Sequence, residues 1–147
     1  MRDIIDQLKK VRKEGKNVYI CGNGGSASTA NHFANDLVKQ CRIKAISLCA
    51  NEAIVMAFGN DNRYENIFSD QLKVFYEDGD LLITISGSGT SKNIVKAQKF
   101  VKEFAKKDIK GAYIIFPTME MLNMDMLRTE DRHLVVSHKI VKELCLN

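Results

Sequence analysis

Apolar residues along the chain form two patterns: in some segments they recur at helical spacing, and in others they form short continuous runs. In residues 3–14 they recur at helical spacing, which predicts an amphipathic helix that ends at Gly15. Continuous runs of apolar and β-branched residues predict strands at 17–21, 44–48, 80–85 and 112–116. Helical patterns fill the intervals, at 26–40, 50–58, 63–76 and 91–107, with Gly59 expected to end the second of these. After Pro117 only a helical pattern remains.

This alternation of strands and helices predicts an α/β fold with an open, mostly parallel sheet. Parallel neighbours need a crossover of about a dozen residues or more, and the helical intervals supply it. The run D-L-L-I-T-I at 80–85 is almost continuously apolar, as is typical of a strand that is buried on both faces. No linker or low-complexity tract interrupts the pattern, so we expect residues 1–147 to form a single domain.

Two turns of small residues each follow an expected strand and precede an expected helix. They read C-G-N-G-G-S-A-S at 21–28 and I-S-G-S-G-T-S-K-N at 85–93. Free backbone N–H groups and the positive end of a helix dipole at such a turn make an anion site. The second turn adds four hydroxyl side chains, which favours a phosphate cradle. The alternative is a simple helix N-cap, because serine and threonine commonly begin helices.

Neither turn carries a nucleotide-binding motif. The chain has no G-x-x-x-x-G-K-[ST] sequence, and G-N-G-G-S lacks the third glycine of G-x-G-x-x-G. We therefore expect no nucleotide cofactor and a small phosphorylated ligand.

Charge and composition exclude several partners. The net charge of +4 comes from lysines spread along helical patterns, so we expect no nucleic-acid partner. The four cysteines form no C-x-x-C pair and no apolar leader opens the chain, which favours a soluble protein of the cytoplasm. No apolar run approaches the roughly 20 residues that span a bilayer, so we expect no membrane association.

Histidines and acidic residues form two groupings, one in each half of the chain. His32 and Asp36 are four residues apart on an expected helix and therefore share a face. Glu130 lies between His133 and His138 on a helical wheel. The two groupings could form one active site. Alternatively, His133 is a hydrogen-bonded core or interface histidine and Glu130 belongs to a solvated or capping turn.

The chain carries three motifs in order. They are G-N-G-G-S-A-S-T-A-N-H-F-A-N-D-L-V at 22–38, G-N-D-N-R-Y-E-N-I-F at 59–68 and G-D-L-L-I-T-I-S-G-S-G-T-S-K-N at 79–93. Together with the final helix E-D-R-H-L-V-V-S-H-K-I-V-K-E-L, they resemble the sugar-isomerase (SIS) domain family, and within it the phosphoheptose isomerase branch. The resemblance implies a flavodoxin-like three-layer sandwich with a C-terminal helix. It also implies assembly as a homodimer or homotetramer with active sites shared between subunits.

The resemblance further implies roles for particular residues. The catalytic base position falls on Asp36 and the acid position on His138. The implied substrate-binding residues are Asn23, Gly24, Gly25, Ser26, Asp61, Ser86, Ser88 and Ser91. Some members bind zinc, and the corresponding ligands here would be His32, Asp36, Glu130 and His138.

The implied activity is an aldose–ketose isomerisation of a phosphosugar. Members of the branch convert sedoheptulose 7-phosphate to D-glycero-D-manno-heptose 7-phosphate, a precursor of bacterial surface heptose. A carboxylate can move a proton between adjacent carbons through an enediol while a histidine serves the oxygens. The first alternative is a non-catalytic SIS module that binds or senses a sugar phosphate. The second is a purely structural oligomer that binds no phosphate ester.

Three positions depart from the pattern of the family. Asp36 replaces a glutamate, which shortens the catalytic arm by one methylene. Glu130 replaces a glutamine and adds a negative charge that would strengthen a cation site. Gly87 replaces a threonine and removes one hydroxyl from the cradle.

Overall fold

A parallel sheet lies at the centre of the structure, a computed structural model that describes residues 2–105 and 113–145. Within these residues its strands are β1 (Asn17–Gly22), β2 (Lys44–Ser47), β3 (Leu81–Ile85) and β4 (Tyr113–Ile115). Their order across the sheet is β2-β1-β3-β4, and each pairing is parallel. This order matches the first four positions of a flavodoxin-like sheet. The expected α/β fold is confirmed.

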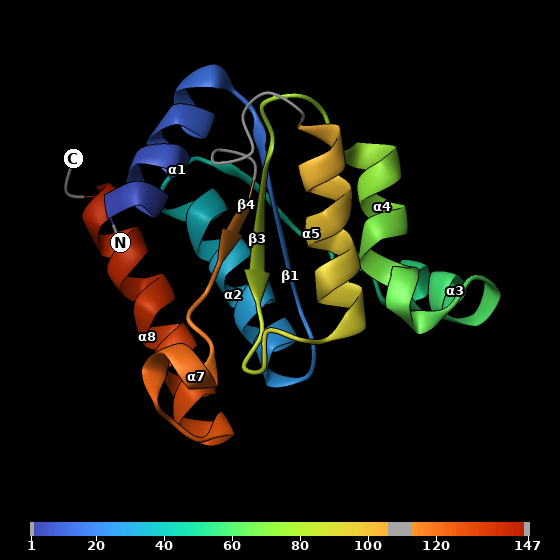
Figure 1. Ribbon diagram of the computed structural model, residues 1–147. Coiled ribbons are helices and arrows are strands. Elements are labelled where there is room, and N and C mark those ends of the chain that lie inside the picture. The colour runs from blue at the N-terminus through green and yellow to red at the C-terminus, as the bar shows by residue number, and fades with distance from the viewer. Residues whose placement is uncertain (1, 106–112, 146–147) are drawn as a thin grey trace.

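Helices cover both faces of the sheet (Figure 1). One face carries α1 (Arg2–Glu14), α2 (Gly25–Lys39) and α8 (Met126–Cys145). The other carries α4 (Ile67–Phe75) and α5 (Lys92–Phe104), with α3 (Glu52–Asp61) and the 3₁₀ turn η1 (Tyr64–Asn66) beside α4. The short helix α7 (Met119–Leu122) precedes α8. This is the expected three-layer sandwich with a C-terminal helix.

Two apolar cores, one on each side of the sheet, hold the layers together. The first joins the buried stripe of α1 to α2 and α8, and it includes Leu8, Phe33 and Ile140. The second joins α4 to α5 and includes Leu72 and Val101. All residues of β3 are buried, as the continuous apolar run predicts. A central parallel strand that is covered on both faces has no polar side to present to water.

Two helix predictions are corrected by the structure. The helix expected to end at Gly59 begins after the N-cap Asn51 and runs through Gly59 to Asp61. Glycine weakens a helix interior by only about 1 kcal/mol, so packing overrides it. The helix expected at 63–76 is divided into η1 and α4, and it begins one residue later than expected, because Arg63 has a positive φ of 137° that no helix residue adopts. The parts of the last expected strand and of the helix at 91–107 that fall within 106–112 lie outside the described residues.

None of the described helices is both long enough and apolar enough to cross a membrane.

The four cysteines are free thiols, and two of them face each other where α2 and α8 end. The Sγ atoms of Cys41 and Cys145 are 3.5 Å apart. Burial, and the hydrogen bond with Cys145, raise the pKa of Cys41 to about 12, so this thiol is neutral at physiological pH.

Gly22 allows β1 to run directly into α2. A Cβ atom at this position would lie 2.6 Å from the backbone oxygen of Ser26, closer than real side chains approach. The atom in the way belongs to the backbone of the first turn of α2 and cannot rotate aside. The missing side chain at Gly22 is therefore a condition for the tight strand-to-helix turn.

We predict that Gly22→Ala lowers the free energy of unfolding by about 1–3 kcal/mol, because the new methyl group overpacks the turn. Gly59→Ala is the matched control. Its Cβ would meet only ordinary contacts at 3.7 Å or more, inside a helix that prefers alanine. Urea denaturation should show the loss for the first variant and an unchanged or raised stability for the second. Equal stability of Gly22→Ala and the parent would contradict the turn geometry.

Candidate functional site

The two small-residue turns begin side by side at the carboxyl edge of the sheet. β1 and β3 are neighbours, and Gly22 lies opposite Ile85 in their register. The strand order reverses at this pair, since β2 lies on one side and β4 on the other. Ligands of open α/β sheets bind at such a switch point. The topology therefore places both predicted turns where a ligand site is expected.

An amide pair connects the first turn to the second. Asn23 Oδ1 accepts hydrogen bonds from Asn93 Nδ2 at 2.8 Å and from the Tyr64 hydroxyl at 3.2 Å. Asn23 Nδ2 donates in return to Asn93 Oδ1 at 3.0 Å. Asn93 is almost fully buried, so this pairing is shielded from water. Asn23 was predicted to bind substrate, but its partners Tyr64 and Asn93 were not, because their only signal in the sequence is their position within the second and third motifs.

The second turn folds around two of its own hydroxyl groups, which accept bonds from backbone N–H groups and can still donate to a ligand. Ser86 Oγ accepts a hydrogen bond from Gly89 N at 3.1 Å, and Ser88 Oγ accepts one from Thr90 N at 3.2 Å. Gly89 has a positive φ of 71°, a conformation that glycine adopts readily because it lacks a Cβ atom. Ser91 stands at the N-cap of α5 but makes no side-chain capping bond. The simple N-cap alternative therefore does not describe Ser91.

A small cavity of about 100 Å³, which we call the cradle cavity, lies between the turns and α8. Its lining residues are Asn23, Ser26, Ser86, Gly87, Ser88, Ser91, Met126 and Glu130. Five of these were predicted to bind substrate. Glu130 comes from α8, and its carboxylate lies so close over Gly25 that a Cβ there would be 2.7 Å from it. Met126 Sδ fills the space that a side chain at Gly87 would take.

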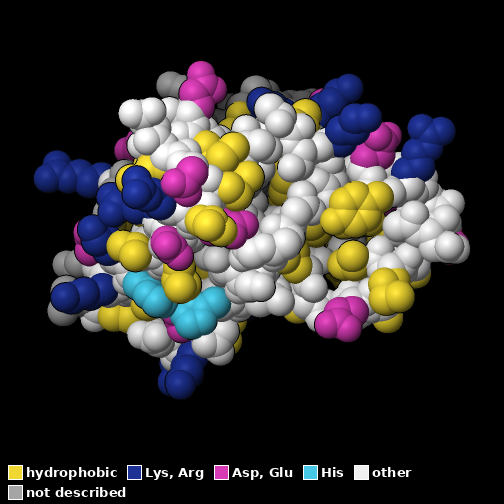
Figure 2. Space-filling model, turned by 90° about the horizontal axis from the view of Figure 1, so that it is seen from below, with side chains coloured by type: hydrophobic (Ala, Val, Ile, Leu, Met, Phe, Trp, Pro, Cys, Tyr) yellow, Lys and Arg dark blue, Asp and Glu magenta, His cyan; other side chains and the backbone are white. Residues whose placement is uncertain are grey.

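Two histidines and an aspartate meet where α8 packs against α2. His32 Nε2 lies 2.9 Å from His138 Nε2, so one ring donates a hydrogen bond to the other. Asp36 Oδ2 lies 3.2 Å from His32 Nε2 and 3.9 Å from His138 Nε2. Figure 2 looks onto the carboxyl edge of the sheet and shows two histidines side by side at the surface. We call His32, Asp36 and His138 the triad.

The triad combines a buried carboxylate with exposed imidazoles. Asp36 is 6% exposed, and its Oδ1 accepts hydrogen bonds from Gln40 at 3.2 Å and Asn35 at 3.3 Å. These bonds orient the carboxylate so that Oδ2 faces the two rings. The side chains of His32 and His138 are about half exposed and remain open to a ligand. One ligand atom from each triad residue falls within 4.8 Å of the others, which suits a metal ion.

The other acidic and imidazole groups lie apart from the triad. His133 is fully buried, and its Nε2 donates to the carbonyl oxygen of Pro117 at 2.6 Å, so it is the hydrogen-bonded core histidine of the alternative reading. Glu130 lies eight residues, or about 12 Å of helix rise, before His138. Asp61 ends α3 at the surface, where Asn60 Nδ2 donates to its Oδ1 at 2.8 Å. It lines neither of the two pockets beside the turns.

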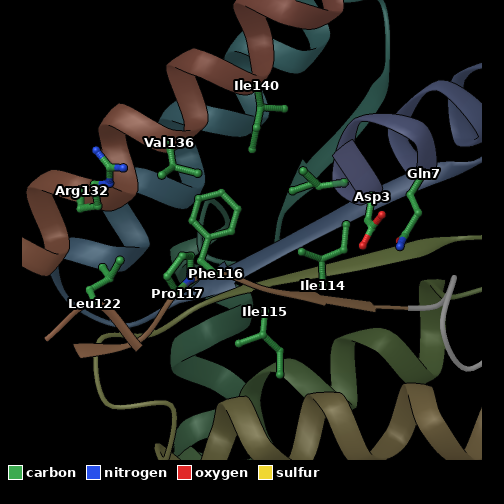
Figure 3. Close-up of a pocket in the computed structure, with 11 residues that line it drawn as sticks. Asp3, Gln7, Ile114, Ile115, Phe116, Pro117, Leu122, Arg132, Val136 and Ile140 are labelled. Carbon is green, nitrogen blue, oxygen red and sulfur yellow. The ribbon is translucent and has the colours of Figure 1, made fainter. Parts of the chain in front are cut away.

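A larger apolar pocket of about 310 Å³ lies away from these residues, between α1, β4 and α8 (Figure 3). Asp3 and Gln7 lie at its α1 end and Arg132 at its α8 end. None of the predicted site residues lines it. The candidate site therefore consists of the cradle cavity at the turns and the triad between α2 and α8.

Comparison with known proteins identifies the family. Residues 1–109 match the SIS domain family. A phosphoheptose isomerase from Clostridium acetobutylicum is 36% identical over 152 aligned positions, which cover 94% of this chain and 77% of that protein. One from Thermodesulfovibrio yellowstonii is 32% identical and covers 94% and 75%. The solved structure of a phosphoheptose isomerase from Neisseria gonorrhoeae shares the fold, with a TM-score of 0.83 at 23% identity over 97% of this chain and 83% of that one. This chain belongs to the SIS domain family, in its phosphoheptose isomerase branch.

Proposed function

We propose that this chain is a phosphosugar aldose–ketose isomerase that converts sedoheptulose 7-phosphate to D-glycero-D-manno-heptose 7-phosphate. The observation that carries the proposal is the triad, which brings a carboxylate and two imidazoles together from α2 and α8. The cradle cavity at the carboxyl edge supplies hydroxyl groups for a phosphate. Membership of the phosphoheptose isomerase branch supports the reaction type and the phosphosugar substrate.

In the proposed mechanism Asp36 moves the carbon-bound proton. Its Oδ2 removes a proton from the carbon next to the substrate carbonyl, and an enediol forms. The same carboxylate then returns a proton to the neighbouring carbon. His138 delivers a proton to one oxygen of the enediol and accepts a proton from the other. The hydrogen bonds of Gln40 and Asn35 to Oδ1 keep Oδ2 directed at the reacting atoms.

The phosphate end is held at the turns. Ser86, Ser88 and Ser91 present hydroxyl groups, and α5 begins directly after them, so its free N–H groups and dipole favour an anion. The first turn, with Asn23, Gly24, Gly25 and Ser26, binds the sugar beside it, and Asp61 contacts sugar hydroxyls from the end of α3. Fixing the phosphate restricts the reacting carbons to a few orientations.

The triad also fits a zinc ion. Two imidazole nitrogens and one carboxylate oxygen form the kind of donor set that catalytic zinc uses, with a fourth position left for substrate. Bound zinc would supply a Lewis acid that polarises the substrate carbonyl. His32, Asp36 and His138 would hold it. The remaining predicted ligand, Glu130, lies against Gly25.

We predict that Asp36→Asn and His138→Ala each lower kcat for sedoheptulose 7-phosphate by at least about a hundredfold, because each removes one proton-transfer group. Asp131→Asn is the matched control, since Asp131 is exposed on α8 and outside the site. Turnover is measured by NMR detection of the aldose product. Parent-like turnover by either site variant would refute the assignment of base or acid.

The same assay separates the isomerase from a sugar-phosphate sensor. A sensor needs the cradle but neither acid nor base, and Asp36 has a shorter arm than the family's glutamate. Calorimetry that shows tight binding of sedoheptulose 7-phosphate together with no aldose product would favour the sensor. Turnover by the parent chain excludes it.

We predict that His32→Ala weakens zinc binding by at least about tenfold, because it removes one of three donors. Glu130→Gln is expected to leave the affinity unchanged, since its carboxylate lies at the other end of α2. Isothermal titration of chelator-stripped protein with zinc measures both. Unchanged affinity in His32→Ala would remove the triad as the metal site, and a loss in Glu130→Gln would add Glu130 to it.

We also propose that the active site is completed in a homodimer or homotetramer. Gly25 and Asp36 are eleven residues apart on α2, or about 16 Å of helix rise, so the cradle and triad of one chain are far apart for one small substrate. Exposed apolar side chains on α7 and α8 offer a surface for self-association. These residues are Met121, Met126, Leu127, Leu134 and Val135. Light scattering should give the mass of two or four chains. A monomer that isomerises the substrate would contradict this proposal.

Two further expectations belong to this function. We propose that residues 1–147 form one SIS domain, because α8 packs on both α1 and α2 and so closes the same core as the sheet. We also propose a cytoplasmic location, since the four free thiols suit a reducing compartment. There the product would feed the synthesis of surface heptose.

A further inference from the structure

The cradle cavity lacks a positive charge for the phosphate it would hold. Among its described lining residues the hydroxyl and amide groups are neutral, and the one charged side chain is the carboxylate of Glu130. A phosphate monoester carries a charge of about −1.5 to −2 at neutral pH. Hydroxyl donors beside a carboxylate do not balance that charge, so the cations must come from a neighbouring part of the site.

A second pocket opens directly beside the cradle. It has a volume of about 380 Å³ and shares Asn23 and Ser91 with the cradle cavity. Its other lining residues are Arg63, Tyr64, Glu65, Lys92 and Asn93. Lys92 is the first residue of α5, so its backbone N–H also belongs to the free helix N-terminus. We call this space the cationic pocket.

The charges in the cationic pocket leave two cations for a ligand. Glu65 Oε1 is paired with Lys96 Nζ at 2.5 Å, and this bond holds the pKa of Glu65 below its ordinary value. Within the described part of the chain, neither Arg63 nor Lys92 forms a salt bridge with an acidic side chain. Arg63 and Lys92 add smaller charge contributions to the lowered pKa of Glu65, but only Lys96 is in salt-bridge contact with its carboxylate. The three cations outnumber the one carboxylate, so Arg63 and Lys92 retain positive charge for an anion.

Arg63 occupies this position at a conformational cost. Its φ of 137° and ψ of 142° lie in a region that glycine adopts readily and L-residues with side chains rarely do. The conformation divides η1 from the preceding helix and places residue 63 on the rim of the cationic pocket. A glycine would fit this backbone without strain. The presence of arginine therefore calls for a role of its side chain.

We propose that Arg63 and Lys92 bind the phosphate group of the sugar phosphate, next to the hydroxyl of Ser91. The guanidinium offers two parallel N–H donors to phosphate oxygens, and the lysine offers a mobile ammonium from the start of α5. Together they supply the charge that the cradle lacks. This inference rests on the proposed phosphosugar substrate and extends it, because it makes the two cations determinants of affinity for the phosphorylated form.

The test is calorimetric binding of sedoheptulose 7-phosphate, sedoheptulose and inorganic phosphate to the full chain. Arg63→Gly and Lys92→Gln are each expected to weaken binding of the phosphate ester about threefold, and the double variant about tenfold, as expected for exposed charge pairs that act independently. Lys99→Gln is the matched control on the outer face of α5 and should bind like the parent. Binding of unphosphorylated sedoheptulose should be the same in all variants.

The thermal stability of Arg63→Gly is expected to change in the opposite direction to its phosphate affinity. Because glycine relieves the backbone strain, its Tm is expected to equal or exceed that of the parent while its phosphate affinity falls. Arg63→Lys keeps the charge but loses the paired N–H donors, so it should weaken binding less than Arg63→Gly does. A double variant that binds the ester as tightly as the parent, or a parent that binds neither the ester nor phosphate, would overturn the inference. Binding with the predicted losses but without turnover would instead reject the isomerase and leave the cationic pocket intact.

Discussion

The packing of α8 against α2 is the contact on which the candidate active site depends. His138 is 106 residues away from His32, and only this helix pair brings their Nε2 atoms to 2.9 Å. Apolar side chains of α8, including Ile140, Val141 and Leu144, are buried in the core that α1 and α2 share. These buried side chains fix the rotation of α8 about its axis, and His138, three residues before the buried Val141, therefore lies at the edge of the face that packs on α2. The packing of the apolar core therefore determines where His138 lies relative to His32.

The parallel sheet makes a second, independent contribution. Its reversal of strand order at β1 and β3 brings two turns together, and the Asn23–Asn93 amide pair joins them. The first turn opens α2, so the cradle and the triad occupy opposite parts of one helix. A rigid helix thus sets the distance between the proposed anion site and the proposed proton-transfer groups. That distance is the physical basis for expecting a second copy of the chain at the complete site.

Much of the fold and part of the site could be predicted from the sequence, because local patterns determine them. Helical periodicity identified the buried stripe of α1, and the glycine and serine turns identified the cradle. Contacts between distant residues could not be predicted. The helical wheel placed His133 and His138 on either side of Glu130, but packing alone decides that His133 is buried against Pro117 and His138 meets α2. Likewise, Met126 fills the space beside Gly87 only because the chain folds back over the turn.

If the triad moves a carbon-bound proton through an enediol, solvent hydrogen can enter the product. Isomerisation of sedoheptulose 7-phosphate by the parent chain in deuterium oxide tests this, with carbon-bound deuterium in the product read by NMR. An acid–base group that exchanges with solvent between its two proton transfers puts deuterium on the carbon next to the carbonyl of the aldose, and we expect this label. Product that forms at full rate with no carbon-bound deuterium would indicate direct hydrogen transfer and contradict the enediol mechanism.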